Sequence, residues 1–205
     1  RLPGGSDRFA RWANMTRWRL TTRFDRAAAA LADRHYSRQT PASPQFVPSG
    51  RTLVLVTEGY GAVWATNWQV SNDGIAFQLH DWPLAWVCAI FRNERPDRDR
   101  SSELVREACA ATVALWGQPP MQGMVTFVDA AKVRKKRDPG RCFLRAGFRC
   151  VGQTRSGKVA LQLVPGDFPP PAVPLGATGY LPGTEQRGFV LRARGTGSFG
   201  GPIQP

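Results

Sequence analysis

The spacing of apolar and polar positions predicts alternating strands and helices along the chain. Continuous β-branched and aliphatic residues over 52–57 are followed by a Gly-containing turn and a second apolar run over 62–68, which predicts an antiparallel hairpin. The run 84–91 is the most apolar and is therefore expected at the centre of a sheet. The run 124–128 is apolar at nearly every position, as expected of a strand covered on both faces. Further strands are predicted over 18–23, 149–154 and 158–164.

Helices are predicted where apolar residues recur every three or four positions. Asp25 is expected to cap a helix that ends near Arg34, because its side-chain oxygen can accept from the first free amides. The pair Ser101–Ser102 is expected to cap a second helix over 103–116. A third, short helix is predicted over 141–146, with a glycine at its end.

This order of elements predicts one α/β domain, over residues 8–165, with a mixed sheet and helices on its faces. Residues 1–7 are rich in Gly and Pro and are expected to form a flexible N-terminus. Composition changes again after 165, so 166–205 is expected to be a Pro/Gly-rich tail, with 188–194 as one adhesive strand within it.

The charge balance points to a polyanionic partner. Lys and Arg total 28 against 15 Asp and Glu, a formal net charge of +13, and nearly all of the positive residues are Arg. The planar guanidinium favours bidentate contact with phosphate, so a nucleic acid is the natural partner. A compositional explanation stays open, because Arg, Ala, Gly and Pro are all abundant, as GC-rich coding would produce.

The four cysteines show no CxxC spacing, which offers neither a zinc site nor a disulfide framework. No apolar run approaches the length of about 18 residues needed to span a bilayer, and the first residues do not resemble a signal peptide. A cytoplasmic protein without a membrane contact is therefore expected.

Two segments resemble the GCN5-related (GNAT-like) acyltransferase fold: the most apolar strand with its following loop and helix start, and the stretch from Phe143 to Phe148. The resemblance implies a mixed, mostly antiparallel central sheet with helices on both faces. It also implies that the helix start holds a cofactor pyrophosphate through Arg98, Arg100, Ser101 and Ser102, as free helix amides and arginines would. Two departures stand out: the loop lacks glycine, and Phe143 replaces a tyrosine that can protonate the departing thiolate.

A narrower set of motifs is similar to the phage Mom-type proteins, which modify adenine in DNA and so block restriction. The matching residues are His35, Tyr36 and Ser37, then Thr126, Phe127 and Asp129, then Gly140 and Phe143. The resemblance implies catalytic roles for His35, Tyr36 and Asp129 in one pocket, and these three could also bind iron. The histidine that the family has soon after the aspartate is missing here.

The residue types suit a base-modifying site. His35 could act as a base, Tyr36 could stack on a flipped base or serve as the acid, and Asp129 could accept from the adenine amine or orient His35. Structural roles remain open for two of them. His35 could be a cation at a helix end, and Asp129 a cap of the turn after its strand.

Contacts with double-stranded DNA are expected from a basic loop beside this site. The predicted nucleic-acid-binding residues are Ser37, Arg38, Lys132, Arg134, Lys135, Lys136 and Arg137. Trp64 and Trp86 are expected in the core, whereas Trp68 and Trp82 could add stacking surface.

Three functions remain in competition. The favoured one is Mom-like transfer of a small acyl-type group to a DNA base, with the adenine N6 amine as the expected acceptor, from acyl-CoA or another acyl donor. The second is acetyl-CoA-dependent acetylation of a small-molecule or protein amine. The third is a non-catalytic, basic DNA-binding protein. The group transferred, the target sequence and the oligomeric state are left open.

Overall fold

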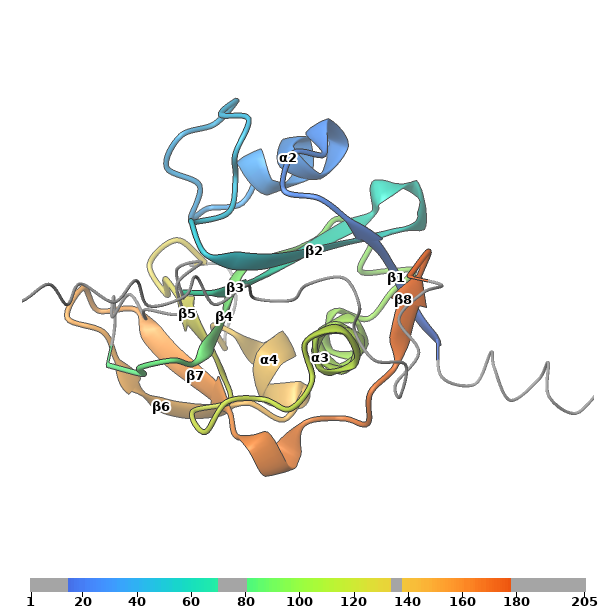
Figure 1. Cartoon of the computed structure of the whole chain (residues 1–205). Coiled ribbons are helices and arrows are strands. Elements are labelled where there is room, and N and C mark those ends of the chain that lie inside the picture. The colour runs from blue at the N-terminus through green and yellow to red at the C-terminus, as the bar shows by residue number, and fades with distance from the viewer. Residues whose placement is uncertain (1–14, 70–80, 134–137, 178–205) are drawn as a thin grey trace, which may run out of the picture.

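A single mixed sheet organises the chain in the computed structural model, which describes residues 15–69, 81–133 and 138–177. Eight strands lie in the order β6-β7-β5-β4-β3-β2-β1-β8 (Figure 1). They are β1 (Met15–Thr21), β2 (Arg51–Thr57), β3 (Ala62–Trp68), β4 (Trp86–Asn93), β5 (Met124–Val128), β6 (Arg149–Gln153), β7 (Val159–Leu163) and β8 (Val173–Leu175). The helices are α2 (Arg26–Asp33), α3 (Ser101–Trp116) and α4 (Arg141–Arg145), with 3-10 turns η1 (Glu58–Tyr60) and η2 (Pro165–Asp167). The predicted α/β class with a mixed sheet is confirmed, and β4 lies in the middle of the sheet as expected.

Two of the strand pairs are parallel, β4 with β5 and β1 with β8, and the others are antiparallel. The β1–β8 pair corrects the expected boundary at residue 165. Val173 pairs with Met15 and Leu175 pairs with Arg19, so this part of the predicted tail completes one edge of the sheet. A three-residue strand is stable here because the backbone groups of β1 supply its hydrogen bonds. Residues 1–7 and the segment 188–194 lie outside the described residues.

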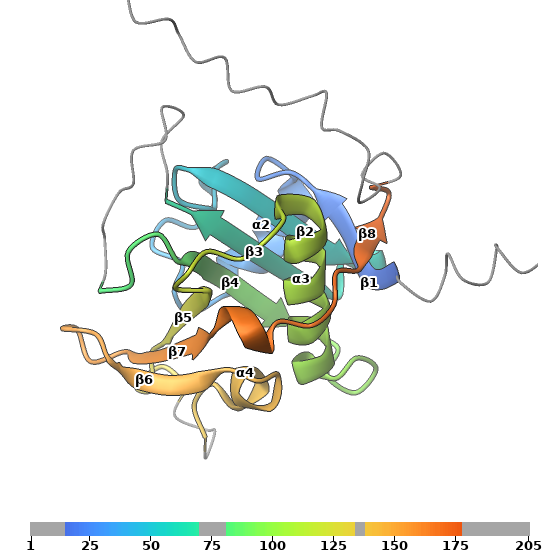
Figure 2. The same ribbon diagram turned by 60° about the horizontal axis from the view of Figure 1, so that its bottom comes forward.

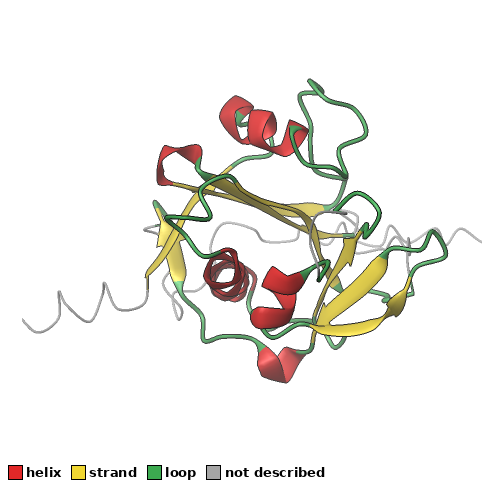
Figure 3. Cartoon of the chain, turned by 180° about the vertical axis from the view of Figure 1, so that it is seen from behind, coloured by secondary structure: helices red, strands yellow, loops and turns green. Residues whose placement is uncertain are grey.

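The sheet separates two hydrophobic clusters, because neighbouring side chains of a strand point to opposite faces. Leu53 and Leu55 of β2 belong to a cluster with residues of α3 and α4, whereas Val54 and Val56 pack in a cluster with residues of α2. Figure 3 shows the same arrangement from behind, with α2 on one side of the strands and α3 and α4 on the other. Viewed from below, α3 runs across the strands from β2 to β4 (Figure 2). Among the described helices, none is both long and apolar enough to cross a membrane.

The helix boundaries follow their capping groups. Asp25 is the N-cap of α2 as predicted, and its carboxylate accepts from the amides of Ala27 and Ala28. The prediction for α3 was wrong by two residues: the helix begins at Ser101, its N-cap is Arg100, and no side chain caps it. The Ser101 hydroxyl instead accepts a hydrogen bond from the side-chain Nδ2 of Asn93 at 3.1 Å.

Candidate functional site

The candidate site lies where β4 and β5 stop pairing. Their parallel ladder consists of the pairs Trp86–Met124 and Val87–Val125. Beyond it, β4 continues its antiparallel ladder with β3, and β5 pairs with β7. The carboxyl-terminal halves of β4 and β5 thus share no ladder among the described residues, and side chains from other segments can enter between them.

Tyr36 enters this region from the segment after α2. Burial raises the pKa of its phenol, a hydrogen bond with the Asp129 backbone opposes the rise, and the neighbouring Cys88, Asp129 and Cys142 raise it further. These neighbours belong to β4, to the end of β5 and to α4, so the phenol lies between all three. The Lys132 ammonium also donates to the Tyr36 carbonyl at 3.4 Å. The structure therefore brings Tyr36 and Asp129 together, although they are far apart in sequence.

His35 packs beside Tyr36, with ring centroids 4.3 Å apart. Its Nδ1 lies 2.7 Å from the Ser37 hydroxyl and accepts from the Ser37 amide at 3.3 Å, which leaves the ring proton on Nε2. Burial, with the positive charge of Arg92, lowers the pKa of His35 to about 4. With this pKa the imidazole is neutral near pH 7, so it lacks the charge that the helix-end interpretation assumes, although the His35 amide donates to the Ala32 carbonyl at the end of α2.

Asp129 has a structural role as well as a place in the site. Its Oδ1 accepts from the backbone amides of Ala131 at 3.1 Å and Lys132 at 3.3 Å. The carboxylate thus caps the turn after β5, which confirms the turn-cap interpretation. The same turn holds the Asp129 backbone against the Tyr36 phenol, so capping and site assembly depend on one side chain.

Ser37 engages the Nδ1 of His35, and the turn after β5 engages the Oδ1 of Asp129. An iron ion would therefore have to bind through His35 Nε2, Asp129 Oδ2 and the Tyr36 phenol oxygen. Within the described ranges, no group of three or more His, Cys, Asp and Glu could hold a metal ion.

The predicted cofactor residues lie at the first turn of α3. Arg100 is the N-cap with a side chain 83% exposed, and Ser101 and Ser102 form the first helical positions. Arg98 is in the preceding turn, where its amide donates to the Arg95 carbonyl at 3.2 Å. The four residues thus lie in the loop after β4 and at the start of α3.

Carboxylates surround this helix start. Arg17 of β1 pairs with Asp99 at 3.0 Å, with Glu103 at 3.2 Å and with Glu107 at 2.7 Å. These bonds raise the pKa of Arg17, foremost the one to Glu107. Anions favour a helix N-terminus, and here Asp99 and Glu103 already fill that role. A pyrophosphate would have to share the position with two negative charges.

The predicted DNA-contacting residues fall into three groups. Arg38 is engaged in an internal ion pair with Asp33 at 2.6 Å and donates to the carbonyls of Ser43 and Gln45. This geometry holds the loop after α2 in place and favours a structural role for Arg38. Ser37 and Lys132 are exposed. The other predicted DNA contacts, Arg134, Lys135, Lys136 and Arg137, lie outside the described residues.

Phe143, where the resemblance expects a tyrosine, is buried in an aromatic cluster. Its ring lies 5.9 Å from that of Phe91, 5.3 Å from Phe148 and 6.3 Å from Trp64. Trp64 and Trp86 are buried as predicted. Phe143 therefore contributes packing and offers no acid, whereas the Tyr36 phenol lies beside the Asp129 backbone.

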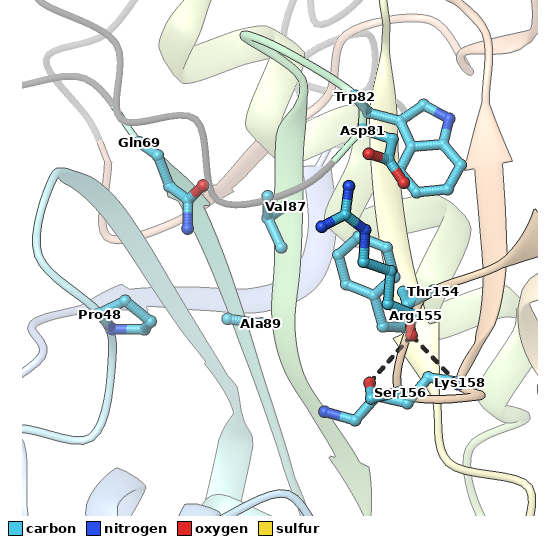
Figure 4. A pocket seen from close by; sticks show the side chains of 11 residues that line it. Pro48, Gln69, Asp81, Trp82, Val87, Ala89, Thr154, Arg155, Ser156 and Lys158 are labelled. Carbon is cyan, nitrogen blue, oxygen red and sulfur yellow. Dashed lines mark hydrogen bonds between the residues drawn. The ribbon is translucent and has the colours of Figure 1, made fainter.

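A groove of about 750 Å³ lies on the same sheet face as α2 and was not predicted. Figure 4 shows Gln69 on one side and Trp82 and Arg155 on the other, with Val87 and Ala89 of β4 between them. The groove draws on segments far apart in the chain, and no spacing in the sequence connects them. The one local signal is that Arg155 lies in the predicted turn of the closing hairpin.

No family model matches the chain, and no curated protein or solved structure is significantly similar to it.

Proposed function

We propose that this protein is a GNAT-like transferase of the Mom type that places a small acyl-type group on a DNA base, with the adenine N6 amine as the expected acceptor. The observation that carries the proposal is the meeting of Tyr36 and Asp129, with His35 packed on Tyr36. These are the residues that the resemblance named as catalytic. The order of elements, with α3 leading from β4 to a parallel β5, supports the GNAT-like fold.

The chemistry of the site is compatible with acyl transfer to an amine. An amine that gains an acyl group must lose a proton, and the Asp129 carboxylate can accept it through Oδ2, because only Oδ1 accepts from the turn amides. The Tyr36 phenol, kept protonated by its raised pKa, donates a hydrogen bond or a proton to the departing group. The net charge of +13 supplies the attraction for DNA.

Acetyl-CoA-dependent acetylation of another amine is the second proposal, and it has weaker support. It rests on the α3 start at the end of β4, where the amides of the first turn point away from the helix. The carboxylates of Asp99 and Glu103 beside that turn favour a donor other than a coenzyme A thioester. Calorimetry with acetyl-CoA distinguishes the two, because micromolar affinity, about 8 kcal/mol, would bring the second proposal forward.

Mass spectrometry of nucleosides from DNA of cells that express the chain tests the first proposal. Tyr36→Phe keeps the ring contact with His35 and removes the hydroxyl, and Asp129→Asn keeps an oxygen for the turn and removes the charge. Both are expected to abolish a modified adenosine that the wild type produces. Arg106→Ala, on the exposed side of α3, is the matched control and should leave the product in place. A wild type that folds, binds DNA and leaves all nucleosides unmodified would point to the non-catalytic alternative.

A further inference from the structure

The groove beside Val87 and Ala89 combines an aromatic wall with positive charge. The rings of Trp82 and Phe127 lie 5.7 Å apart at an interplanar angle of 53°, and both side chains are half-buried. The hairpin turn between β6 and β7 adds Arg155, which is exposed, and Lys158. Figure 4 shows the Arg155 side chain extending from this turn into the groove. Aromatic faces stack on nucleobases, and arginine and lysine bind phosphates.

Gln69 adds an unsatisfied polar group to the opposite wall. Its Oε1 is buried and has no hydrogen-bond partner among the described residues. A buried acceptor left without a donor costs free energy, so a ligand that brings an N–H group would be stabilised there. A glutamine carboxamide forms paired hydrogen bonds with an adenine edge, because adenine presents an amine donor beside a ring-nitrogen acceptor.

The floor of the groove is a β-bulge. Ala65 of β3 pairs with Ile90 and Thr66 pairs with Cys88, so Ala89 has no partner residue on β3. Bulges re-aim neighbouring side chains and are frequent beside active sites. Here the bulge lets both Ala89 and Ile90 face away from α3, Ala89 into the groove and Ile90 into the α2 cluster. A small alanine at the floor leaves room for a planar ligand.

We propose that this groove holds a single unpaired nucleotide of a DNA strand, with the base against Trp82 and Phe127, its edge on Gln69, and its flanking phosphates on Arg155 and Lys158. The volume of about 750 Å³ is within the range of small-ligand pockets, about 300–1,000 Å³, and accepts one nucleotide but no duplex. Enzymes that modify a base take it out of the helix stack. The inference deepens the proposed function and rests on it for the identity of the nucleic acid.

The groove and the candidate catalytic residues are connected through β5. Phe127 of β5 lines the groove, and Asp129 follows two positions later in the turn that its carboxylate caps. The groove and the Tyr36–Asp129 contact are therefore close along the chain at this end of β5.

Fluorescence anisotropy with two labelled duplexes tests the groove. One duplex is fully paired, and the other carries the same sequence with one adenine opposite an abasic position. The wild type should bind the second duplex about tenfold tighter or more, because the cost of unpairing the base has already been met. Trp82→Ala should remove this preference, since loss of one stacking contact costs about 1–3 kcal/mol, roughly 5- to 150-fold. Trp82→Phe should restore most of it.

Two further variants keep the test decisive if Trp82→Ala does not fold. Gln69→Ala should reduce the preference for the unpaired adenine while leaving affinity for the paired duplex unchanged. Arg155→Ala should weaken binding of the unpaired probe more than Arg106→Ala does, although both remove one positive charge. Equal affinity of the wild type for both duplexes would overturn the inference, as would a preference that survives in all three groove variants.

Nucleoside mass spectrometry on the same variants separates this inference from the proposed function. A wild type that prefers the unpaired adenine and yields no modified nucleoside would sink the proposed function and leave the groove assignment intact. A wild type that modifies adenine, with full modification and no changed preference in Gln69→Ala and Trp82→Ala, would sink the groove assignment alone.

Discussion

Replacement of Asp25 by alanine is expected to lower the free energy of unfolding by about 2–4 kcal/mol. One carboxylate oxygen accepts from the amides of Ala27 at 2.9 Å and Ala28 at 3.2 Å. The other accepts from the hydroxyls of Thr21 at 2.6 Å and Tyr60 at 3.0 Å. Loss of an N-cap costs about 1 kcal/mol. Each hydroxyl contact adds about 1 kcal/mol, below the usual contribution of bonds to charged groups because Asp25 is only half-buried.

Asp25→Asn separates the cap from the charge. The side-chain oxygen of asparagine can still accept from the first amides of α2. The variant should therefore lower the free energy of unfolding by only about 1 kcal/mol. Partial burial raises the pKa of Asp25, but the hydrogen bonds from Thr21, Ala28, Tyr60 and Ala27 prevail and lower it. A lowered folded pKa means that the carboxylate stabilises the protein above the unfolded value of about 3.9, and that this stability is lost as the pH falls through the folded pKa. The asparagine variant should lack that loss.

Urea unfolding followed by tryptophan fluorescence at pH 7 and pH 3 measures both effects. The wild type should lose more stability between the two pH values than Asp25→Asn does, and Tyr60→Phe should fall between the wild type and Asp25→Ala at pH 7. A loss below about 0.5 kcal/mol for Asp25→Ala at pH 7 would refute the reasoning. His35 and Tyr36 follow α2 directly in the chain. The same variants therefore measure how much the N-cap of α2 contributes to the stability of the fold that positions these two residues.

Three shorter predictions follow from single residues. Gly140→Ala should destabilise the protein by about 1–3 kcal/mol in the same urea assay, because Gly140 has a φ of 78° and an added Cβ would lie 2.5 Å from Leu161 Cδ1; full stability would contradict the geometry. His35 should titrate by NMR near pH 4, against about 6.5 in a peptide, so stability should fall as the pH drops from about 6.5 toward 4; a midpoint near 6.5 would show an open, solvated ring. Cys150 is exposed and should react with a thiol reagent in the native state, whereas Cys88, buried and with its pKa raised by burial, should react only after unfolding.

The sheet and its helices could be predicted because each strand carries its own apolar signal. The segments 62–68 and 124–128 were predicted with the bounds that β3 and β5 have. Strand β8 could not be predicted in this way. It has three residues with a proline in the middle, and its stability comes from pairing with β1 at the other end of the chain. Local composition therefore indicated a tail where the fold has an edge strand.

The site was predictable only in part, for a similar reason. The contact between Tyr36 and Asp129 was expected from a resemblance, since no periodicity connects a loop after α2 with the end of β5. Arg38 was predicted to contact DNA from its residue type and position. The residue type does not reveal whether a side chain is exposed, and the ion pair with Asp33 shows that Arg38 has an internal role. The groove was missed because its bulge at Ala89 arises from strand pairing, which the sequence of β4 does not reveal.

The ion pairs refine what the net charge means for function. Seven carboxylates are paired with arginines within the described residues: Asp33, Glu94, Asp99, Glu103, Glu107, Asp138 and Asp167. Bonds from Arg34 and Arg92 lower the pKa of Glu94 to about 2, so this acid is charged at every physiological pH. Acids held in such pairs are not available to neutralise other cations. The excess of +13 must therefore lie on the remaining positive side chains. A polyanion would bind where acids are scarce. The groove is one such place, because its described lining residues include Arg155 and Lys158 with Asp81 as the one acid among them.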